Sequence, residues 1–375
     1  MSKIEELIQR LCPDGVEYKP LEDVCSFYNG FAFKSSLFKE RGFKIVRITN
    51  IDGRGIDMSD IKFFDAKDYK ANLKTYEINR GDILIAMSGA TTGKIGYYDQ
   101  TETLYLNQRV GKILSKRELL DQKYLYHFLL TQSTNIYLSA GGGAQPNLSS
   151  QKFLKEFTIP VPPIEVQQEI VRILDKFTAI SEKLNAELDL RKKQYEYYCE
   201  FLITREKGTE KRLKDILLIK NGRDYKHLKE GDIPVYGSGG VMTYVNESTY
   251  DKPSVLIPRK GSLDKLYYID TPFWNVDTVF YTEIKTDIIV PKYLYYSLRL
   301  QHLEKLNNAG GVPSLTQSVL KNVCVLVPPI SEQERIVSIL DKFEALLYDK
   351  EKGLPAEIRK VQQQYEYYRD KLLTF

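Results

Sequence analysis

The stretch IPVPPIEVQQEIVRILDKF occupies residues 159–177, and a close copy, VLVPPISEQERIVSILDKF, occupies residues 325–343. The two align without a gap at a constant offset of 166 residues. In each, a proline pair precedes a run in which apolar residues recur every three or four positions. Proline is tolerated at a helix start, and this spacing places apolar side chains on one helical face. The sequence therefore predicts the same helix twice.

The repetition extends well beyond these two stretches. Further matching segments are QYEYY at 194–198 and 364–368, KYLYHFLL at 123–130 with KYLYYSLR at 292–299, and LEDVCSFYNG at 21–30 with LKDILLIKNG at 213–222. Self-similarity over such a length indicates two copies of one structural unit. We therefore expect a pseudo-two-fold internal repeat that covers nearly all of the chain after residue 17.

Each copy divides into two zones of different pattern. The first zone has short runs of Ile, Val, Tyr and Phe broken by Gly, Asn, Asp and Pro, which is typical of strands and turns. The second zone has helical periodicity. We therefore predict a first head (residues 1–157, including an N-terminal segment), a first arm (158–208), a second head (209–323) and a second arm (324–375).

The arms predict two long helices that pack on each other. A helix of about 35 residues rises about 50 Å, and one apolar stripe on it needs a partner in water. The other arm is the obvious partner, so the predicted fold class is α+β, with two globular domains separated by long helices packed as an antiparallel coiled coil. The alternative is two unrelated surface helices on separate cores.

The second arm carries an insertion. The interval from the ILDKF phenylalanine to the last tyrosine of QYEYY is 21 residues in the first arm and 25 in the second. The four extra residues fall near 352–358, where Gly353 and Pro355 also interrupt a helix. Four residues are about one turn, which a kink or local unwinding absorbs.

Composition excludes several classes of protein. A length of 375 residues favours two or three domains, and no run of about 18 apolar residues indicates a membrane span. The four cysteines form no C-x-x-C pair, and none of the three histidines lies at zinc-ligand spacing from a cysteine. We therefore expect a cytoplasmic protein with reduced thiols and no metal site.

Two similar arms that carry different heads suit a target with two separated parts, and DNA is the commonest such target. Pieces of a DNA site one helical turn apart lie about 34 Å from each other, within the expected arm length. The net charge of +4 is compatible with nucleic acid but does not establish it.

The order of these motifs resembles the specificity subunit of type I restriction–modification enzymes over essentially the full length, with the QYEYY blocks, the ILDKF runs and the proline pairs matching together. The resemblance implies two target-recognition domains, each of which reads one half of an interrupted double-stranded DNA site. It implies arms that set the spacing and dock two methyltransferase (M) subunits and, through them, restriction (R) subunits, in a system for DNA methylation and phage defence. It also implies a non-catalytic chain without a cofactor, with S-adenosylmethionine, ATP and Mg²⁺ used by the partner subunits. The segment NAEL at 185–188 resembles a four-residue unit that sets the gap between half-sites in this family.

Polar and basic residues in equivalent loops of the two heads are the candidates for DNA contact, since such side chains bind phosphates and base edges. In the first head these are Lys34, Ser35, Ser88, Thr91, Thr92, Lys94, Gln108 and Arg109. In the second head they are Arg223, Lys226, Arg259, Lys260, Ser262, Lys265 and Asn275. The alternative is that these loops are solvated hairpin tips. The stretch MSGATTGKIGYY (87–98) lacks the spacing and the hydroxyl of a phosphate-binding loop, so we do not expect it to bind ATP.

The repeated tyrosines are the candidates for partner binding: Tyr195, Tyr197, Tyr198, Tyr365, Tyr367 and Tyr368. Tyrosine is common at protein interfaces because its ring is buried while its hydroxyl stays at the rim. The equally open alternative is that these tyrosines only seal the helix pair.

No motif for catalysis is evident. The VPPI segments lack the flanking residues of an amino-methyltransferase loop, and the scattered histidines suggest no catalytic triad. Two other classes stay open: a coiled-coil adaptor that joins two protein partners without DNA, and a self-sufficient enzyme.

Overall fold

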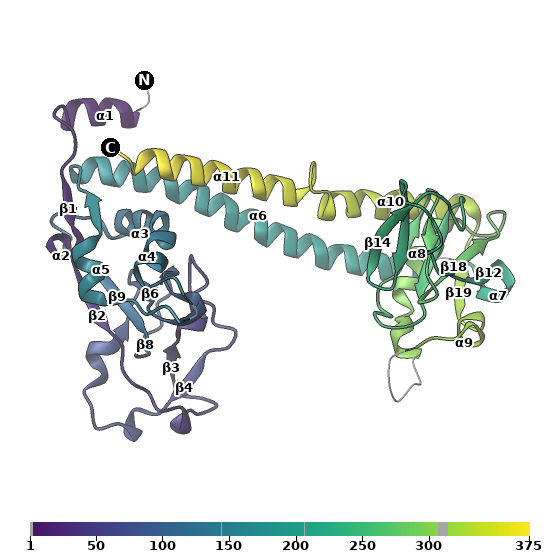
Figure 1. Ribbon diagram of the computed structural model, residues 1–375, viewed down its shortest axis with the longest axis horizontal. Helices are drawn as coiled ribbons and strands as arrows, with labels where there is room; N and C mark the ends of the chain where they lie inside the picture. The colour runs from purple at the N-terminus through teal and green to yellow at the C-terminus, as the bar shows by residue number, and fades with distance from the viewer. Residues whose placement is uncertain (1–2, 144, 206, 307–313) are drawn as a thin grey trace. The chain divides into compact units, whose positions relative to one another are not determined.

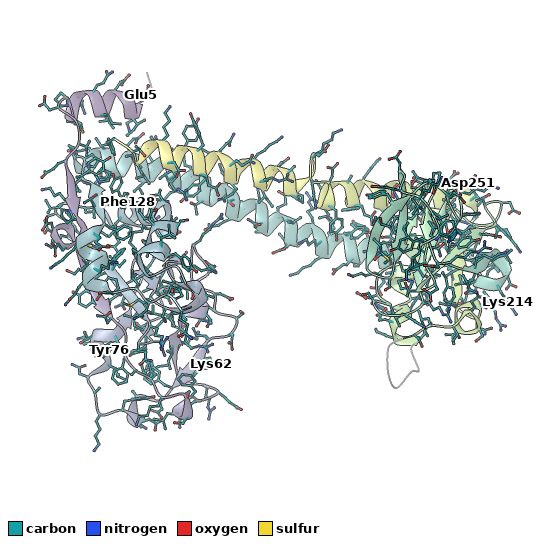
Figure 2. The ribbon with its side chains drawn as sticks, in the orientation of Figure 1. Glu5, Lys62, Tyr76, Phe128, Lys214 and Asp251 are labelled. Carbon is teal, nitrogen blue, oxygen red and sulfur yellow. The ribbon has the colours of Figure 1, made fainter. Side chains whose placement is uncertain are left out.

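The computed structural model describes residues 3–143, 145–205, 207–306 and 314–375 (Figure 1). It divides into two compact units: residues 1–183 with 359–375, and residues 184–358. Each unit combines one head with parts of both arms. The four-segment division drawn from the sequence stays a prediction, because the boundary between the units falls within the arms.

The first head is built on two four-stranded sheets. The first sheet is antiparallel, in the order β2 (Cys25–Asn29), β9 (Val110–Ser115), β6 (Ile83–Ala86) and β7 (Ile95–Tyr97). The second has the order β4 (Lys62–Phe64), β3 (Phe43–Val46), β8 (Leu104–Leu106) and β5 (Glu77–Ile78), with β3 and β8 parallel. A separate pair joins β1 (Tyr18–Pro20) to β10 (Thr158–Pro160). The chain therefore leaves the head beside the point where it enters.

Short helices complete this unit. They are α1 (Lys3–Leu11), α2 (Leu21–Val24), α3 (Gln122–Thr131), α4 (Ser133–Ser139) and α5 (Ser150–Glu156). Single 3₁₀ turns are η1 (Ser35–Leu37), η2 (Ile48–Asn50), η3 (Ala66–Asp68), η4 (Leu73–Tyr76) and η5 (Gly89–Thr91).

The second head repeats the main sheet of the first although its sequence differs, and among the described residues its second sheet has three strands where that of the first head has four. Its main sheet has the order β12 (Leu217–Asn221), β18 (Val279–Ile284), β15 (Ser254–Pro258) and β16 (Tyr267–Ile269), strand for strand the order of the first head. Its second sheet has the order β14 (Gly240–Val245), β13 (Ile233–Gly237) and β17 (Trp274–Asn275), with β13 and β17 parallel. β11 (Thr209–Arg212) pairs with β19 (Cys324–Val327). The helices are α7 (Leu213–Ile216), α8 (Pro291–Leu300), α9 (Gln317–Lys321) and the 3₁₀ turn η6 (Leu303–Leu306).

The arms are three helices. The first arm is a single helix of 41 residues, α6 (Ile164–Thr204), and the second arm is α10 (Ile330–Tyr348) followed by α11 (Leu354–Leu372). In the first unit the N-terminal part of α6 runs beside α11 in the opposite direction, and we call this contact the first seam (Figure 1). In the second unit the C-terminal part of α6 packs on α10, which we call the second seam. The predicted α+β fold with paired antiparallel helices is thus confirmed.

The predicted interruption of the second arm is also confirmed, between α10 and α11. Asp349 follows α10, and its Oδ1 accepts hydrogen bonds from the backbone N–H groups of Glu351 (2.7 Å) and Lys352 (3.1 Å). These bonds hold the pKa of Asp349 below its usual value. A Cβ on Gly353 would lie 2.6 Å from the carbonyl oxygens of Ala345 and Leu346, so only glycine fits at this turn.

Each head is fixed to its arm by a buried glutamine from the repeated helix. In the first unit Gln167 accepts from the Asp121 backbone N–H (2.8 Å) and donates to the carbonyls of Leu119 (2.9 Å) and Pro162 (2.7 Å). In the second unit, Gln333 makes the same three bonds, to Val290, Ile288 and Pro328. Both side chains are fully buried. Since a buried amide left without partners is costly, this arrangement fixes the start of each arm to its head.

A glycine at the end of the first main-sheet strand allows a close backbone approach in each head. A Cβ on Gly30 would lie 1.9 Å from the Asn107 carbonyl oxygen, and one on Gly222 would lie 2.1 Å from that of Val276. We expect Gly30→Ala and Gly222→Ala each to lower the free energy of unfolding by at least about 2 kcal/mol, because backbone must move to make room. Denaturant titration measures this loss.

The matched controls are Gly55→Ala and Gly239→Ala, one in each head, where a Cβ meets no atom closer than 4.0 Å. Equal stability of a test variant and its control would contradict the close approach.

Candidate nucleic-acid interface

In the first head, three chain segments meet at one end of the main sheet. Arg109 Nη1, after β8, donates to Ser88 Oγ after β6 (3.2 Å), and the Met87 N–H donates to the Arg109 carbonyl (2.9 Å). The Gly89 N–H donates to the Pro146 carbonyl (3.2 Å). The β6–β7 loop, the β8–β9 turn and the segment before α5 are thus held together, and the side chains of Lys94, Gln108 and Arg109 are exposed there.

The predicted pair Lys34 and Ser35 is exposed but belongs to different surroundings. The Lys34 N–H donates to the Tyr69 hydroxyl (3.1 Å), next to an aromatic cluster of Phe31, Phe33 and Tyr69 against the second sheet. Within the described residues, no hydrogen bond joins Lys34 or Ser35 to the loops that hold Lys94 and Arg109. Their part in DNA binding stays a prediction.

The second head brings together the equivalent segments. The Arg259 N–H donates to the Thr278 carbonyl (2.8 Å), and the Leu315 N–H donates to the Arg259 carbonyl (2.9 Å). The segment after β12 is tied to β17 by a hydrogen bond from the Arg223 N–H to the Asn275 carbonyl (2.9 Å). Around this junction Arg223, Lys226, Lys260 and Lys265 are exposed, while Arg259 and Ser262 are half-buried. The guanidinium of Arg259 lies 5.8 Å from the centre of the Phe280 ring.

Three predicted contact residues are buried. Ser88, Thr92 and Asn275 are at most 5% exposed. Thr92 Oγ1 donates to the Gly89 carbonyl (2.7 Å), and Asn275 Nδ2 donates to the Val279 carbonyl (2.8 Å). A buried polar group must find partners locally, so these side chains shape the loops. These three side chains contribute almost nothing to the exposed surface of either head. Thr91 is half-buried on the same loop.

The six repeated tyrosines take three different positions, the same in each block. The first, Tyr195 or Tyr365, is buried, and burial raises the pKa of Tyr365 to about 12. The third stacks on the phenylalanine of the other copy's ILDKF run: Tyr198 on Phe343 (5.6 Å) and Tyr368 on Phe177 (5.4 Å). The middle residues, Tyr197 and Tyr367, are about 60% exposed (59% and 61%). Four of the six tyrosines thus contact the helix pair, although Tyr368 is still 40% exposed, and Tyr197 and Tyr367 are the most exposed of the six.

Sequence reasoning missed the polar groups that connect each head to its arm beside the seam. Asp175 of ILDKF binds Lys123 Nζ (2.5 Å) and His127 Nε2 (3.2 Å), and His127 Nδ1 lies 3.0 Å from the Tyr365 hydroxyl. Burial opposes ionisation of Asp175, but the bonds from His127 and Lys123 outweigh it and hold its pKa below the usual value.

The second seam has a matching network. Asp341 accepts from the Tyr296 hydroxyl (2.6 Å) and binds Lys292 (2.9 Å), while the Tyr195 hydroxyl donates to Glu344 (2.8 Å). The sequence could have indicated these ion pairs, because both of the motifs that supply them, KYLY and ILDKF, are duplicated. KYLY supplies Lys123 and Lys292, and ILDKF supplies Asp175 and Asp341.

No helix in the described part of the chain is both long and apolar enough to cross a membrane. Among the described residues, no three His, Cys, Asp or Glu side chains gather where they could hold a metal ion.

Two heads that share the topology of the main sheet, each docked on the same duplicated helix, define a class of two-domain recognition protein. A family model described as the type I restriction modification DNA specificity domain matches residues 13–190 and 206–360. The chain therefore belongs to the type I restriction–modification DNA specificity family, and it is the specificity component of such a system.

Similar proteins agree with this assignment. A putative type I restriction enzyme specificity subunit from Haemophilus influenzae is 29% identical, with 96% of each chain covered. A type I restriction enzyme specificity subunit from Escherichia coli is 31% identical over 80% of this chain and 82% of its own. The crystal structure of the S subunit of a type I restriction–modification system from M. genitalium superposes with a TM-score of 0.61, at 18% identity, covering 96% of this chain and 97% of the other. That likeness supports the fold.

The exposed cations of each head give a prediction about salt. In the assembled restriction–modification complex, the double variant K260Q/K265Q should lower DNA affinity, and so should K94Q/R109Q. Each should also reduce the slope of log affinity against log salt by about 1 to 2, because fewer counterions are released. Fluorescence anisotropy across a salt series measures both quantities.

Lys74 and Lys214 are exposed lysines outside these loops, one in each head, and K74Q and K214Q serve as controls. If the controls and the double variants gave the same slope, the assigned loops would not form the interface.

Proposed function

We propose that each head reads one half of an interrupted DNA sequence and that the arms fix the gap between the halves. The observation that carries this proposal is the equivalence of the loops. The β6–β7 and β15–β16 loops occupy the same place in the same sheet order, yet one presents Lys94 and the other Lys260 and Lys265. Equivalent loops with different side chains suit two half-sites of different sequence.

We also propose that the arms dock two methyltransferase subunits and, through them, restriction subunits. Support comes from Tyr197 and Tyr367, which are equivalent, exposed and adjacent to a buried seam. The ring of Tyr197 stacks on Phe201 at 5.7 Å, so an aromatic surface is already in place. Two equivalent surfaces suit two copies of one partner.

The chemistry in this proposal belongs to the partners. S-adenosylmethionine would be used by the methyltransferase subunits, and ATP and Mg²⁺ by the restriction subunits. The chain itself would recognise DNA without catalysing a reaction. A coiled-coil adaptor that joins only proteins is disfavoured, because the loops described above expose cations and family membership points to DNA.

The arms can be tested by a change of length. Four residues inserted at 185–188 in α6 add about one turn, or 6 Å, to a helix. We expect the gap between half-sites to grow by about two base pairs, since one base pair rises about 3.4 Å, while both half-site sequences stay the same. Sequencing of methylated sites in cells that carry the variant measures both. Changed half-sites with an unchanged gap would contradict the proposal.

The exposed tyrosines can be tested by stoichiometry. We expect Tyr197→Ala and Tyr367→Ala each to weaken the binding of one methyltransferase subunit, because each removes one of two aromatic surfaces. Native mass spectrometry should then show a one-to-one complex at concentrations where the unchanged chain binds two subunits. Thermal unfolding of the free chain should be unaffected.

The control for this test is Leu138→Ala, at an exposed apolar residue (62%) on α4. Full two-to-one assembly by both tyrosine variants would remove these surfaces from the docking site.

A further inference from the structure

The second head carries an exposed apolar strand at a sheet edge. β14 pairs with β13 on one side only among the described residues. From Gly240 to Val245 it holds no charged residue, and Val241 (47%), Met242 (57%) and Tyr244 (53%) are exposed. Edge strands in proteins usually carry charges or prolines that prevent unwanted pairing. Because neighbouring exposed apolar side chains often form an interaction site, we infer that these three bind a partner.

A bulge in this hairpin turns two neighbouring apolar side chains outward. Tyr236 faces Val241 while Val235 faces Thr243, so Met242 is the extra residue. Strict alternation would bury every second side chain, and a bulge redirects one of them. A Cβ on Gly237 would lie 2.6 Å from Met242 Sδ, so the thioether lies over this glycine near the tip of the hairpin.

The tip of the hairpin lies beside the basic loop of the same head. The Tyr267 hydroxyl donates to the Ser238 carbonyl (3.2 Å), and a Cβ on Gly261 would lie 3.1 Å from Ser238 Oγ. Gly261 stands between Lys260 and Ser262, which are on the β15–β16 loop. The apolar edge is therefore continuous with the proposed DNA interface, and this continuity points to DNA as its occupant.

The first head has no such feature on the equivalent strand. Its β4 consists of Lys62, Phe63 and Phe64, of which Phe64 is fully buried and the other two are half-buried. Residues 47–61 separate β3 from β4, where the second head has a tight hairpin. An activity of the β13–β14 hairpin would thus affect one half-site only.

We propose that Met242, supported by Val241, inserts between neighbouring base pairs of the half-site read by the second head, while Lys260 and Lys265 bind adjacent phosphates. The inference rests on the proposed function. Cations on phosphates carry no sequence information, whereas apolar side chains between base steps select steps that unstack easily. Methionine is among the residues that proteins use in this way.

The test uses the chain assembled with its methyltransferase and DNA that carries 2-aminopurine, whose emission rises when a base unstacks. We expect increased emission at one step of the second head's half-site and none in the other half. Met242→Ala should abolish that increase and lower affinity about tenfold, the scale of one lost base contact, with the salt slope unchanged. Met242→Leu should retain most of both.

The matched control is Leu218→Ala, at another exposed apolar residue (51%) of the same head, which should bind like the unchanged chain. Emission and affinity that Met242→Ala leaves unchanged would overturn the inference. So would a loss of methyltransferase binding by Met242→Ala, which would assign the edge to a protein partner. A complex without any sequence preference, or one indifferent to K260Q/K265Q, would instead refute the proposed function and the inference with it.

Discussion

The structure depends on a reciprocal contact between the two copies of the repeat. Tyr198 of the first copy stacks on Phe343 of the second, and Tyr368 of the second stacks on Phe177 of the first. Each seam therefore needs one residue from each copy, and neither copy closes a seam by itself. This explains why QYEYY occurs twice, once for each seam. An aromatic pair contributes about 1 kcal/mol to stability beyond the effect of the area that it buries, so the loss of one pair would destabilise the seam that contains it.

The polar groups at the contacts between heads and arms are the same in both copies of the repeat, whereas the loops of the two heads differ. Gln167 and Gln333 make three equivalent bonds each, and Asp175 and Asp341 each bind a lysine of the adjacent head. The two glutamines tolerate little change, because a buried donor or acceptor without its partner costs about 1–3 kcal/mol. The exposed cations of the loops, such as Lys94, Lys260 and Lys265, carry no such constraint. A duplicated scaffold whose loops differ between the two heads is an arrangement that suits a sequence reader.

Much of the scaffold could be predicted from the sequence, because its elements are periodic. The spacing of apolar residues by three and four positions predicted α6 and α10. Gly353 and Pro355 predicted the interruption between α10 and α11. The duplication predicted that the heads repeat one unit, but the strand order within that unit was not predictable, since short strands held by long-range pairing leave little local pattern. For the same reason, the sequence could not show which candidate site residues are exposed. Whether Asn275 faces a ligand or the Val279 carbonyl depends on tertiary packing, and the exposure of Met242 depends on a bulge that no local rule predicts.

The central claim, two different sensors held at a fixed separation, is tested most directly by the methylation pattern of DNA in cells that carry this chain with its methyltransferase. Single-molecule sequencing should find one interrupted motif, with two dissimilar halves and a gap of constant length. A contiguous motif, two identical halves, or a gap that varies from site to site would contradict the account.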